Sequence, residues 1–181
     1  CALPIYRDGP VALALSRQKL PVLPGTATRA REGVARGGYV LADAVGASGA
    51  TVDPDLILIA TGSEVSLAMA TRDELAGSGI RARVVSLPSW ERFAAQPRAY
   101  RDAVLPPGER RRVAIEAGVS LGWERWAGTD GAIVALDRFG ASAPAGQLLE
   151  RFGFTPAAVA AVARRVHAGE APGIVSASPH H

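Results

Sequence analysis

Few positions in this sequence combine a residue type and a setting that suit catalysis or ligand binding. Arg17 lies just past the apolar run 11–15, and a guanidinium beyond the carboxyl end of a strand could hold a phosphate through two parallel hydrogen bonds. Gly62 and Ser63 stand at a predicted helix start, where free backbone amides could hold an anion. Glu116 ends a predicted strand and could act as an acid or a base. From the residues alone, a solvated arginine, a plain helix cap and a structural hydrogen bond are the simpler interpretations.

Other residue types exclude several kinds of site. The single cysteine, Cys1, excludes a disulfide framework and a metal site built from cysteines. His180 and His181 end the chain, a pattern that a purification tag would produce, and His167 falls near the end of a predicted helix, where a cation suits the helix dipole. No histidine stands beside a candidate serine or cysteine nucleophile. We therefore expect no catalytic, cofactor-binding or metal-binding residues within this chain.

The composition indicates a folded chain without a specialised charged surface. Of the 181 residues, 48% are hydrophobic, which is enough for a packed core. No apolar run reaches the roughly 18 residues of a membrane span. The net charge of +3 is modest, and the densest basic run, Arg110 to Arg112, lacks interleaved aromatic residues and is expected to be a solvated loop. We expect neither membrane nor nucleic acid among the partners, and a reducing, cytoplasmic setting.

The elements that must position the candidate residues are clearest in the first half of the chain. Residues 56–60 form a continuous apolar run, which is typical of a strand buried on both faces of a parallel sheet. Thr61 and Glu64 have the capping-box spacing, which predicts a helix starting within two residues of Ser63. A second apolar strand is predicted at 83–87. Together these elements predict a βαβ unit whose first strand is central to the sheet.

Strands and helices alternate through the rest of the chain. Further strands are predicted at 38–44, 112–117 and 132–136, the first of them at a sheet edge. Helices are predicted after Ser89, at 97–105, at 122–127, at 143–152 and, capped by Thr155, at 156–167. The three tryptophans, Trp90, Trp123 and Trp126, are expected in the core or in a dimer contact. This alternation predicts an α/β fold, a three-layer domain with a mostly parallel sheet of about five strands.

The first 36 residues do not fit this domain. Residues 11–15 form another uninterrupted apolar run and predict a doubly buried strand, but residues 16–38 contain no predicted element. A structureless loop of that length is uncommon inside one compact domain. We therefore expect 1–27 to be the remnant of a second α/β domain whose other strands lie outside this chain. Residues 28–36 are then a linker, 37–176 the main domain and 177–181 a tail.

Six separate segments of the sequence together resemble one family. In order, they are LSRQKLP (15–21), ARGGYVLADA (35–44), DLILIATGSEVSLA (55–68), ARVVSLPSWERFAAQ (82–96), VAIEAG (113–118) and FGASAPA (139–145). They resemble the carboxy-terminal quarter of transketolase. The resemblance runs from about residue 9 to residue 165, which is nearly the whole chain.

The resemblance implies that this chain is one part of an enzyme whose function also needs domains outside this chain. Transketolase is a homodimer that uses thiamine diphosphate and a divalent cation, magnesium, to move a two-carbon ketol unit between sugar phosphates. By resemblance, 1–27 is the end of the middle, pyrimidine-binding domain and 37–176 is the C-terminal domain. The cofactor site and the metal ligands would lie upstream, so we expect no cofactor on this chain alone. Arg17 matches the arginine that binds the phosphate end of the sugar substrate.

Two other interpretations stay open at this point. The chain could be a free-standing domain that binds a phosphorylated metabolite at the helix start of Gly62 and Ser63, or a dimerisation domain without a ligand. The lone strand at 11–15 argues against both, because an independent domain would not need it. Whether the chain is a fragment or a separate subunit of a split enzyme is left open by the residues.

Overall fold

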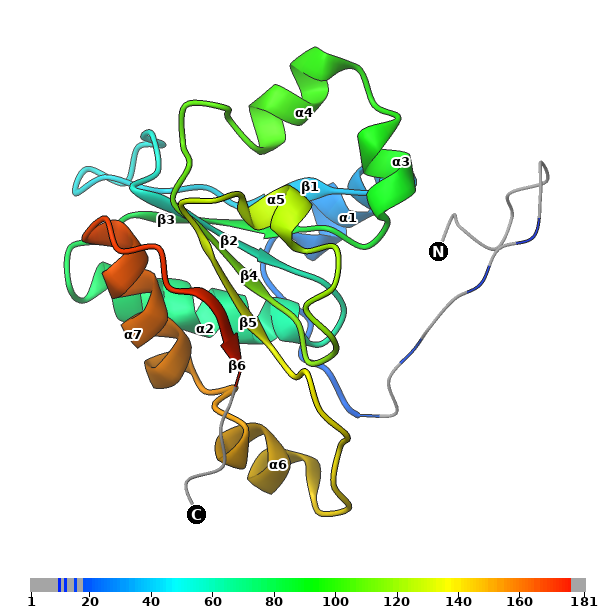
Figure 1. The fold of residues 1–181 in the computed structure, drawn as a ribbon. Helices are drawn as coiled ribbons and strands as arrows, with labels where there is room; N and C mark the ends of the chain where they lie inside the picture. The colour runs from blue at the N-terminus through cyan, green and yellow to red at the C-terminus, as the bar shows by residue number, and fades with distance from the viewer. Residues whose placement is uncertain (1–9, 11, 13–14, 16–17, 177–181) are drawn as a thin grey trace.

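One mixed sheet organises the part of the chain that the structure describes. The computed structural model describes residues 10, 12, 15 and 18–176 (Figure 1). Its strands are β1 (Tyr39–Ala42), β2 (Leu56–Ala60), β3 (Ala82–Ser86), β4 (Arg112–Ile115), β5 (Ala132–Ala135) and β6 (Gly173–Ser176). Their order in the sheet is β1-β3-β2-β4-β5-β6; β1 is antiparallel to β3, and all other neighbours are parallel. The predicted α/β fold with a mostly parallel sheet is confirmed.

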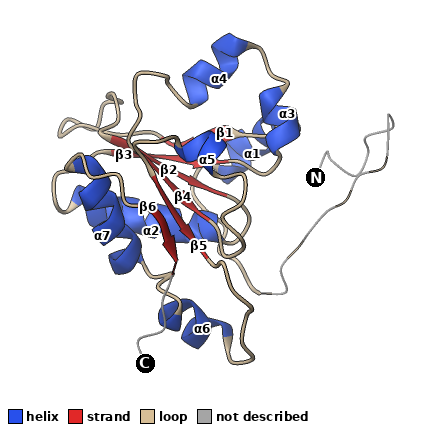
Figure 2. Cartoon of the chain, viewed as in Figure 1, coloured by secondary structure: helices blue, strands red, loops and turns tan. Residues whose placement is uncertain are grey.

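Helices cover both faces of this sheet (Figure 2). They are α1 (Thr26–Ala35), α2 (Glu64–Ala76), α3 (Trp90–Ala94), α4 (Arg98–Val104), α5 (Glu124–Ala127), α6 (Ala145–Arg151) and α7 (Pro156–His167). Side chains of α1, α2, α6 and α7 pack on one face, and side chains of α3, α4 and α5 pack on the other. These are the three layers that the alternation predicts. None of the helices in the described part is long and apolar enough to cross a membrane.

Strand β2 lies in the middle of the sheet, as its sequence predicts. All five of its residues are fully buried. Leu56 and Leu58 join the core cluster on one face, while Ile57 and Ile59 join the cluster on the other. Both faces must therefore be apolar, which explains why the run shows no alternation of polar and apolar residues.

Helix α1 corrects the expectation that residues 16–38 contain no regular element. The Nη1 atom of Arg29 donates to the backbone oxygens of Val40 (3.2 Å) and Leu41 (3.3 Å), which ties the helix to the edge strand β1. Gly33 allows close approach, because a Cβ at this position would lie 2.2 Å from Cγ of Tyr39. These contacts are tertiary, and the helix has few apolar residues of its own. That 28–36 links two domains stays a prediction.

Two further sequence predictions concern the strand at 11–15 and the number of strands in the sheet. The strand predicted at 11–15 falls mainly on residues outside the described part, so it stays a prediction. The sheet has six strands where about five are expected, because β6 carries too short a signal to stand out. It is recognised by its partner: Ile174 and Val175 pair with Ile133 and Val134 of β5.

The start of α2 is where predicted, but its capping differs. The helix begins at Glu64, within two residues of Ser63. The capping box is wrong: no hydrogen bond to the Thr61 hydroxyl occurs among the described residues, and Ser63 Oγ donates to Glu64 Oε1 at 2.6 Å. The reason is a turn before the helix, in which Gly62 has φ +56° and the Glu64 amide donates to the Thr61 carbonyl. The turn places Thr61 before the capping position.

Two threonine substitutions test this difference. Thr155 caps α7, since its side chain accepts from the Ala158 amide at 3.3 Å, as the sequence predicts. We expect Thr155→Ala to lower the free energy of unfolding by about 0.5–2 kcal/mol. The matched control Thr61→Ala, which removes no cap, should lower it by less than about 0.5 kcal/mol. Urea unfolding of both variants measures the difference, and equal losses would contradict this assignment of caps.

Candidate functional site

The strand order identifies one point of the sheet at which α/β proteins commonly bind ligands. From β2 the chain moves to β3 on one side, and it then crosses to β4 on the other side of β2. In open α/β sheets, ligands bind outside the carboxyl ends of the strands where the order reverses in this way. Here that point lies between β2 and β4. The residues that follow these two strands are therefore the candidate site.

Two glutamates come together at this point. Glu64 is 8% exposed at the start of α2, and Glu116 follows β4 directly and is half-buried. Burial is the main cause that raises the pKa of Glu116 to about 7, and the negative charge of Glu64 adds to it. A hydrogen bond with the Trp123 side chain acts in the opposite direction. Glu116 can therefore give or take a proton near neutral pH, although the structural hydrogen bond expected from sequence is also present.

Glu64 is the residue that sequence reasoning missed. The sequence alone identifies no carboxylate partner for Glu116, because 51 residues lie between the two glutamates along the chain. A signal was available: both residues follow apolar strands, and neighbouring parallel strands bring their carboxyl ends to the same edge of a sheet. The pattern of apolar residues does not show, however, that β2 and β4 are neighbours in the sheet.

The raised pKa of Glu116 predicts how stability changes with pH. Because the pKa in the folded chain, about 7, lies above the usual 4.5, the folded state holds this proton more tightly than the unfolded state. The resulting stabilisation is complete below about pH 4.5 and is lost as the pH rises through about 7. With a discount for partial exposure, we expect the free energy of unfolding to fall by about 1–3 kcal/mol across this window.

The variant Glu116→Gln tests this prediction, because glutamine does not titrate. We expect its free energy of unfolding, measured by urea at several pH values, to lose most of the wild-type slope between pH 4.5 and 7. Glu150→Gln, at an exposed position of α6, is the control and should keep that slope. An unchanged slope in Glu116→Gln would show that another group carries it.

The helix start at Gly62 and Ser63 is a poor anion site. The carboxylate of Glu64 already lies in the first turn of α2 and accepts a hydrogen bond from the Ser63 hydroxyl. A bound anion would therefore meet a negative charge at the place where the helix dipole would attract it. Within the described part, no group of three or more histidine, cysteine, aspartate or glutamate side chains could hold a metal ion. Arg17 lies outside the described residues.

Two hollows occur at the opposite, amino edge of the sheet. One, of about 610 Å³, is lined by Asp53, Arg81 and Arg83 among others; the second, of about 330 Å³, is lined by residues that precede β4, β5 and β6. Neither coincides with the two glutamates. Both contain arginines that already have carboxylate partners: Arg83 pairs with Asp43 at 3.0 Å and Arg110 with Asp130 at 2.8 Å.

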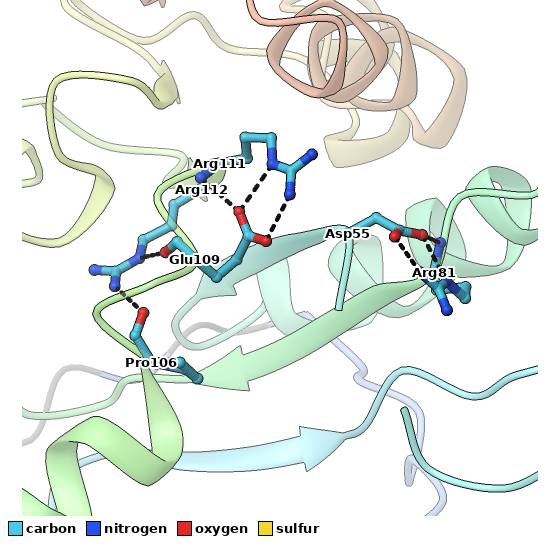
Figure 3. A network of polar contacts seen from close by, with 6 residues as sticks. All are labelled: Asp55, Arg81, Pro106, Glu109, Arg111 and Arg112. Carbon is cyan, nitrogen blue, oxygen red and sulfur yellow. Dashed lines mark hydrogen bonds and ion pairs between the residues drawn. The ribbon is translucent and has the colours of Figure 1, made fainter. Parts of the chain in front are cut away.

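Figure 3 shows how the polar residues at this amino edge are used. Asp55 Oδ2 accepts from both the backbone N–H and Nε of Arg81 at 2.8 Å, and this arginine lowers the pKa of Asp55 to about 2. Glu109, 9% exposed, accepts from Nε (3.0 Å) and Nη2 (2.9 Å) of Arg111. The pair of Asp55 and Arg81 joins the starts of β2 and β3, and the pair of Glu109 and Arg111 lies within the loop before β4, so these polar groups have structural partners.

The run from Arg110 to Arg112 is therefore more than the solvated loop expected from sequence. Only Arg110 is largely exposed, with a side chain 67% accessible. Arg111 pairs with Glu109, and Arg112 donates to backbone carbonyls. The expectation failed because the acceptors of Arg112 are main-chain atoms, which a pattern of side chains does not reveal.

The tryptophans belong to the core, as expected. Trp123 and Trp126 are 2% and 6% exposed and lie in the same cluster, so they share a face of their helical segment. Trp90 packs edge-on against Trp123, with ring centroids 5.0 Å apart. Such contacts stabilise the layer that α3 and α5 form over the sheet and leave little ring surface for stacking on a sugar.

Comparison with known proteins identifies similar chains. A family model described as "Transketolase-like TK C-terminal domain" matches residues 37–155. Transketolase of Mycobacterium tuberculosis (strain H37Rv) is 55% identical over 158 residues, which is 87% of this chain and 22% of that protein. Transketolase of Geobacillus stearothermophilus is 52% identical over 148 residues, which is 82% of this chain and 21% of that protein.

Solved structures are similar over the same range. Transketolase from Pichia stipitis in complex with sedoheptulose-7-phosphate has a TM-score of 0.74 and 36% sequence identity, and the match covers 91% of this chain and 22% of that one. The chain thus spans about a fifth of the length of the relatives it matches. The similarity also extends upstream of residue 37, because fewer than 158 residues follow that position.

Proposed function

The chain belongs to the family of transketolase-like C-terminal domains, and from this premise we propose that it works as the C-terminal part of a transketolase. In that enzyme a two-carbon ketol unit would pass between sugar phosphates. The observation that carries the proposal is the identity of 52–55% to transketolases of two bacteria over more than four-fifths of this chain. Identity at this level favours a shared function, whereas likeness of fold alone would not.

The similarity upstream of residue 37 supports a role for the first residues as well. The family model for the C-terminal domain begins at residue 37, but the match to the Mycobacterium tuberculosis protein begins earlier. This agrees with an end of the pyrimidine-binding domain at 1–27, joined to the C-terminal domain by 28–36. On this proposal Arg17 binds the terminal phosphate of the sugar substrate. The Pichia stipitis transketolase was solved with a sugar phosphate, which is the substrate class we propose here.

Thiamine diphosphate and magnesium would be held by other parts of the enzyme. The described residues of this chain do not fit either group: they lack a metal-ligand cluster, and the helix start that could face a phosphate carries Glu64. The chain's own contribution is then substrate binding through Arg17 together with contacts to the remaining domains, in a cytoplasmic homodimer. The alternative of a free-standing phosphate-binding domain is weakened by the same glutamate.

A chimera tests the proposal. The upstream part of Geobacillus stearothermophilus transketolase, joined to this chain in place of its own matching segment, should transfer ketol units between sugar phosphates. The upstream part alone is the control and should be inactive. A chimera that is folded and dimeric but inactive would overturn the proposal.

The isolated chain provides a second test. We expect no saturable binding of thiamine diphosphate with magnesium at micromolar concentration, because the described residues provide neither a metal cluster nor an unopposed anion site. Isothermal titration calorimetry measures this directly, with the chimera as the positive control. Saturable binding by the isolated chain would show that it carries a cofactor site of its own.

A further inference from the structure

Exposed apolar side chains gather in two loops at the carboxyl edge of the sheet. Val119 and Leu121, in the loop after β4, are 61% and 80% exposed, and Phe139, in the loop after β5, is 96% exposed. Scattered exposed apolar residues are ordinary. These three belong to neighbouring loops, because β4 and β5 are adjacent parallel strands whose carboxyl ends meet at one edge (Figure 1).

The two loops are held together by hydrogen bonds. The Leu136 amide donates to the Gly118 carbonyl at 2.8 Å, and the Ser120 amide donates to Asp137 Oδ1 at 2.8 Å. The hydrogen bond from the Ser120 amide, together with one from the Ser120 side chain, lowers the pKa of Asp137. Ser120 is itself buried, so the loop is anchored at its middle residue while Val119 and Leu121 on either side face outward. The outward direction is therefore built into the fold.

The exposed apolar side chains of these loops lie in uncharged segments, and the charged residues Glu116, Asp137 and Arg138 stand before them. No charged residue occurs at 117–122 or at 139–147, in a chain of which 20% is charged. Every residue from 137 to 147 is exposed, and α6, which begins within this segment, has no buried residue. We call residues 117–122 and 139–147 the uncharged rim. Depletion of charge around exposed aromatic and aliphatic side chains is typical of the core of a protein interface.

We propose that the uncharged rim is the surface on which the upstream portion of a transketolase chain docks; this rests on the proposed function. The length of the relatives supports that occupant, because they are more than four times as long as the segment they share with this chain. The composition supports it too, because the exposed Val119, Leu121 and Phe139 within uncharged segments suit an apolar protein surface. By contrast, the amino edge of the sheet carries the ion pairs of Arg81 and Arg110, and such charged groups are typical of a surface that faces solvent.

Hydrogen exchange in the active chimera tests the proposal. Amides at 117–122 and 139–147 should exchange at least tenfold more slowly in the chimera than in the isolated chain, whereas the loop at 45–51 should not change. Val119→Asp should remove this protection and leave the thermal unfolding of the isolated chain unchanged. The matched control is Val45→Asp, an exposed valine at the amino edge, which should keep the protection.

The other outcomes separate this inference from the function on which it rests. An active chimera whose rim exchanges as fast as in the isolated chain would overturn the inference and leave the function standing. Protection in the isolated chain that grows with protein concentration would identify a second copy of this chain as the occupant and would also overturn it. A folded, inactive chimera would overturn the proposed function and this inference with it.

Discussion

Replacing Arg112 by methionine is expected to lower the free energy of unfolding by about 2–4 kcal/mol, which is the largest loss of stability among the variants that we propose. The guanidinium donates to the backbone carbonyls of Glu109 (2.9 Å), Pro106 (2.9 Å) and Trp126 (3.2 Å), and more weakly to Leu105 (3.5 Å). It therefore joins the loop before β4 to the end of α5. Figure 3 shows two of these bonds.

The size of the effect follows from what methionine leaves behind. The methionine side chain can replace the aliphatic stem of Arg112, but the carbonyl groups of Glu109 and Trp126 lose this donor, and a buried group left without a partner costs about 1–3 kcal/mol. The Pro106 carbonyl keeps the Glu109 amide as a donor at 3.1 Å. Burial lowers the pKa of Arg112, which means that the folded chain already bears a desolvation penalty for this cation. That penalty disappears in the variant, so the net loss should be smaller than the sum of the lost bonds.

Urea unfolding followed by tryptophan fluorescence measures this loss, because Trp126 lies beside the affected loop. Arg110→Met is the matched control: its ion pair with Asp130 is exposed, and its removal should cost less than about 1 kcal/mol. Arg112→Lys should fall between the two, since an ammonium keeps the charge but cannot reach carbonyls on several sides. Similar losses for Arg112→Met and Arg110→Met would contradict the role that we assign to the carbonyl contacts.

In a complete transketolase that carries this chain, Arg17→Ala should raise KM for phosphorylated sugars about tenfold to a hundredfold and leave kcat nearly unchanged. On the proposed function, the guanidinium binds a phosphate far from the reacting carbon, equally in the ground state and the transition state. Such an interaction changes KM rather than kcat. Arg17→Lys should recover part of the loss, because it keeps the charge and loses the two-pronged geometry.

Steady-state kinetics with phosphorylated and unphosphorylated acceptors, measured side by side, decide this prediction. Unphosphorylated acceptors should be almost unaffected, because they present no phosphate to Arg17. Arg31→Ala, at an exposed position of α1, controls for loss of positive charge in the same part of the chain. Equal losses with both kinds of acceptor would mean that Arg17 supports the fold instead of binding substrate.

Much of the sheet could be predicted from the sequence, because its signals are local. Residues 56–60 are all apolar since both of their faces are buried, and no other information is needed to place them in the middle of a parallel sheet. Thr155 precedes Pro156 and a helical pattern, and it caps the helix as predicted. The edge position of β1 follows from the alternation of Tyr39 and Leu41 with less buried neighbours.

Elements whose support comes from elsewhere in the chain could not be predicted in this way. Helix α1 depends on carbonyl groups of β1 and on the space that Gly33 leaves for Tyr39. Strand β6 is only four residues long and is defined by its pairing with β5. The capping box at Thr61 failed because the left-handed turn at Gly62 displaces the helix start, and a spacing rule does not include that turn.

The candidate site shows the same division most clearly. The sequence by itself determined that Glu116 ends a strand and that Glu64 begins a helix, because each position follows from a local run of apolar residues. Only the tertiary structure decided that the two carboxylates lie close enough for their charges to interact, since this requires the chain to cross β2 after β3 and to place β4 on the other side of β2. The pKa of Glu116 rises because burial and a second charge act on it together, and both depend on which strands are neighbours.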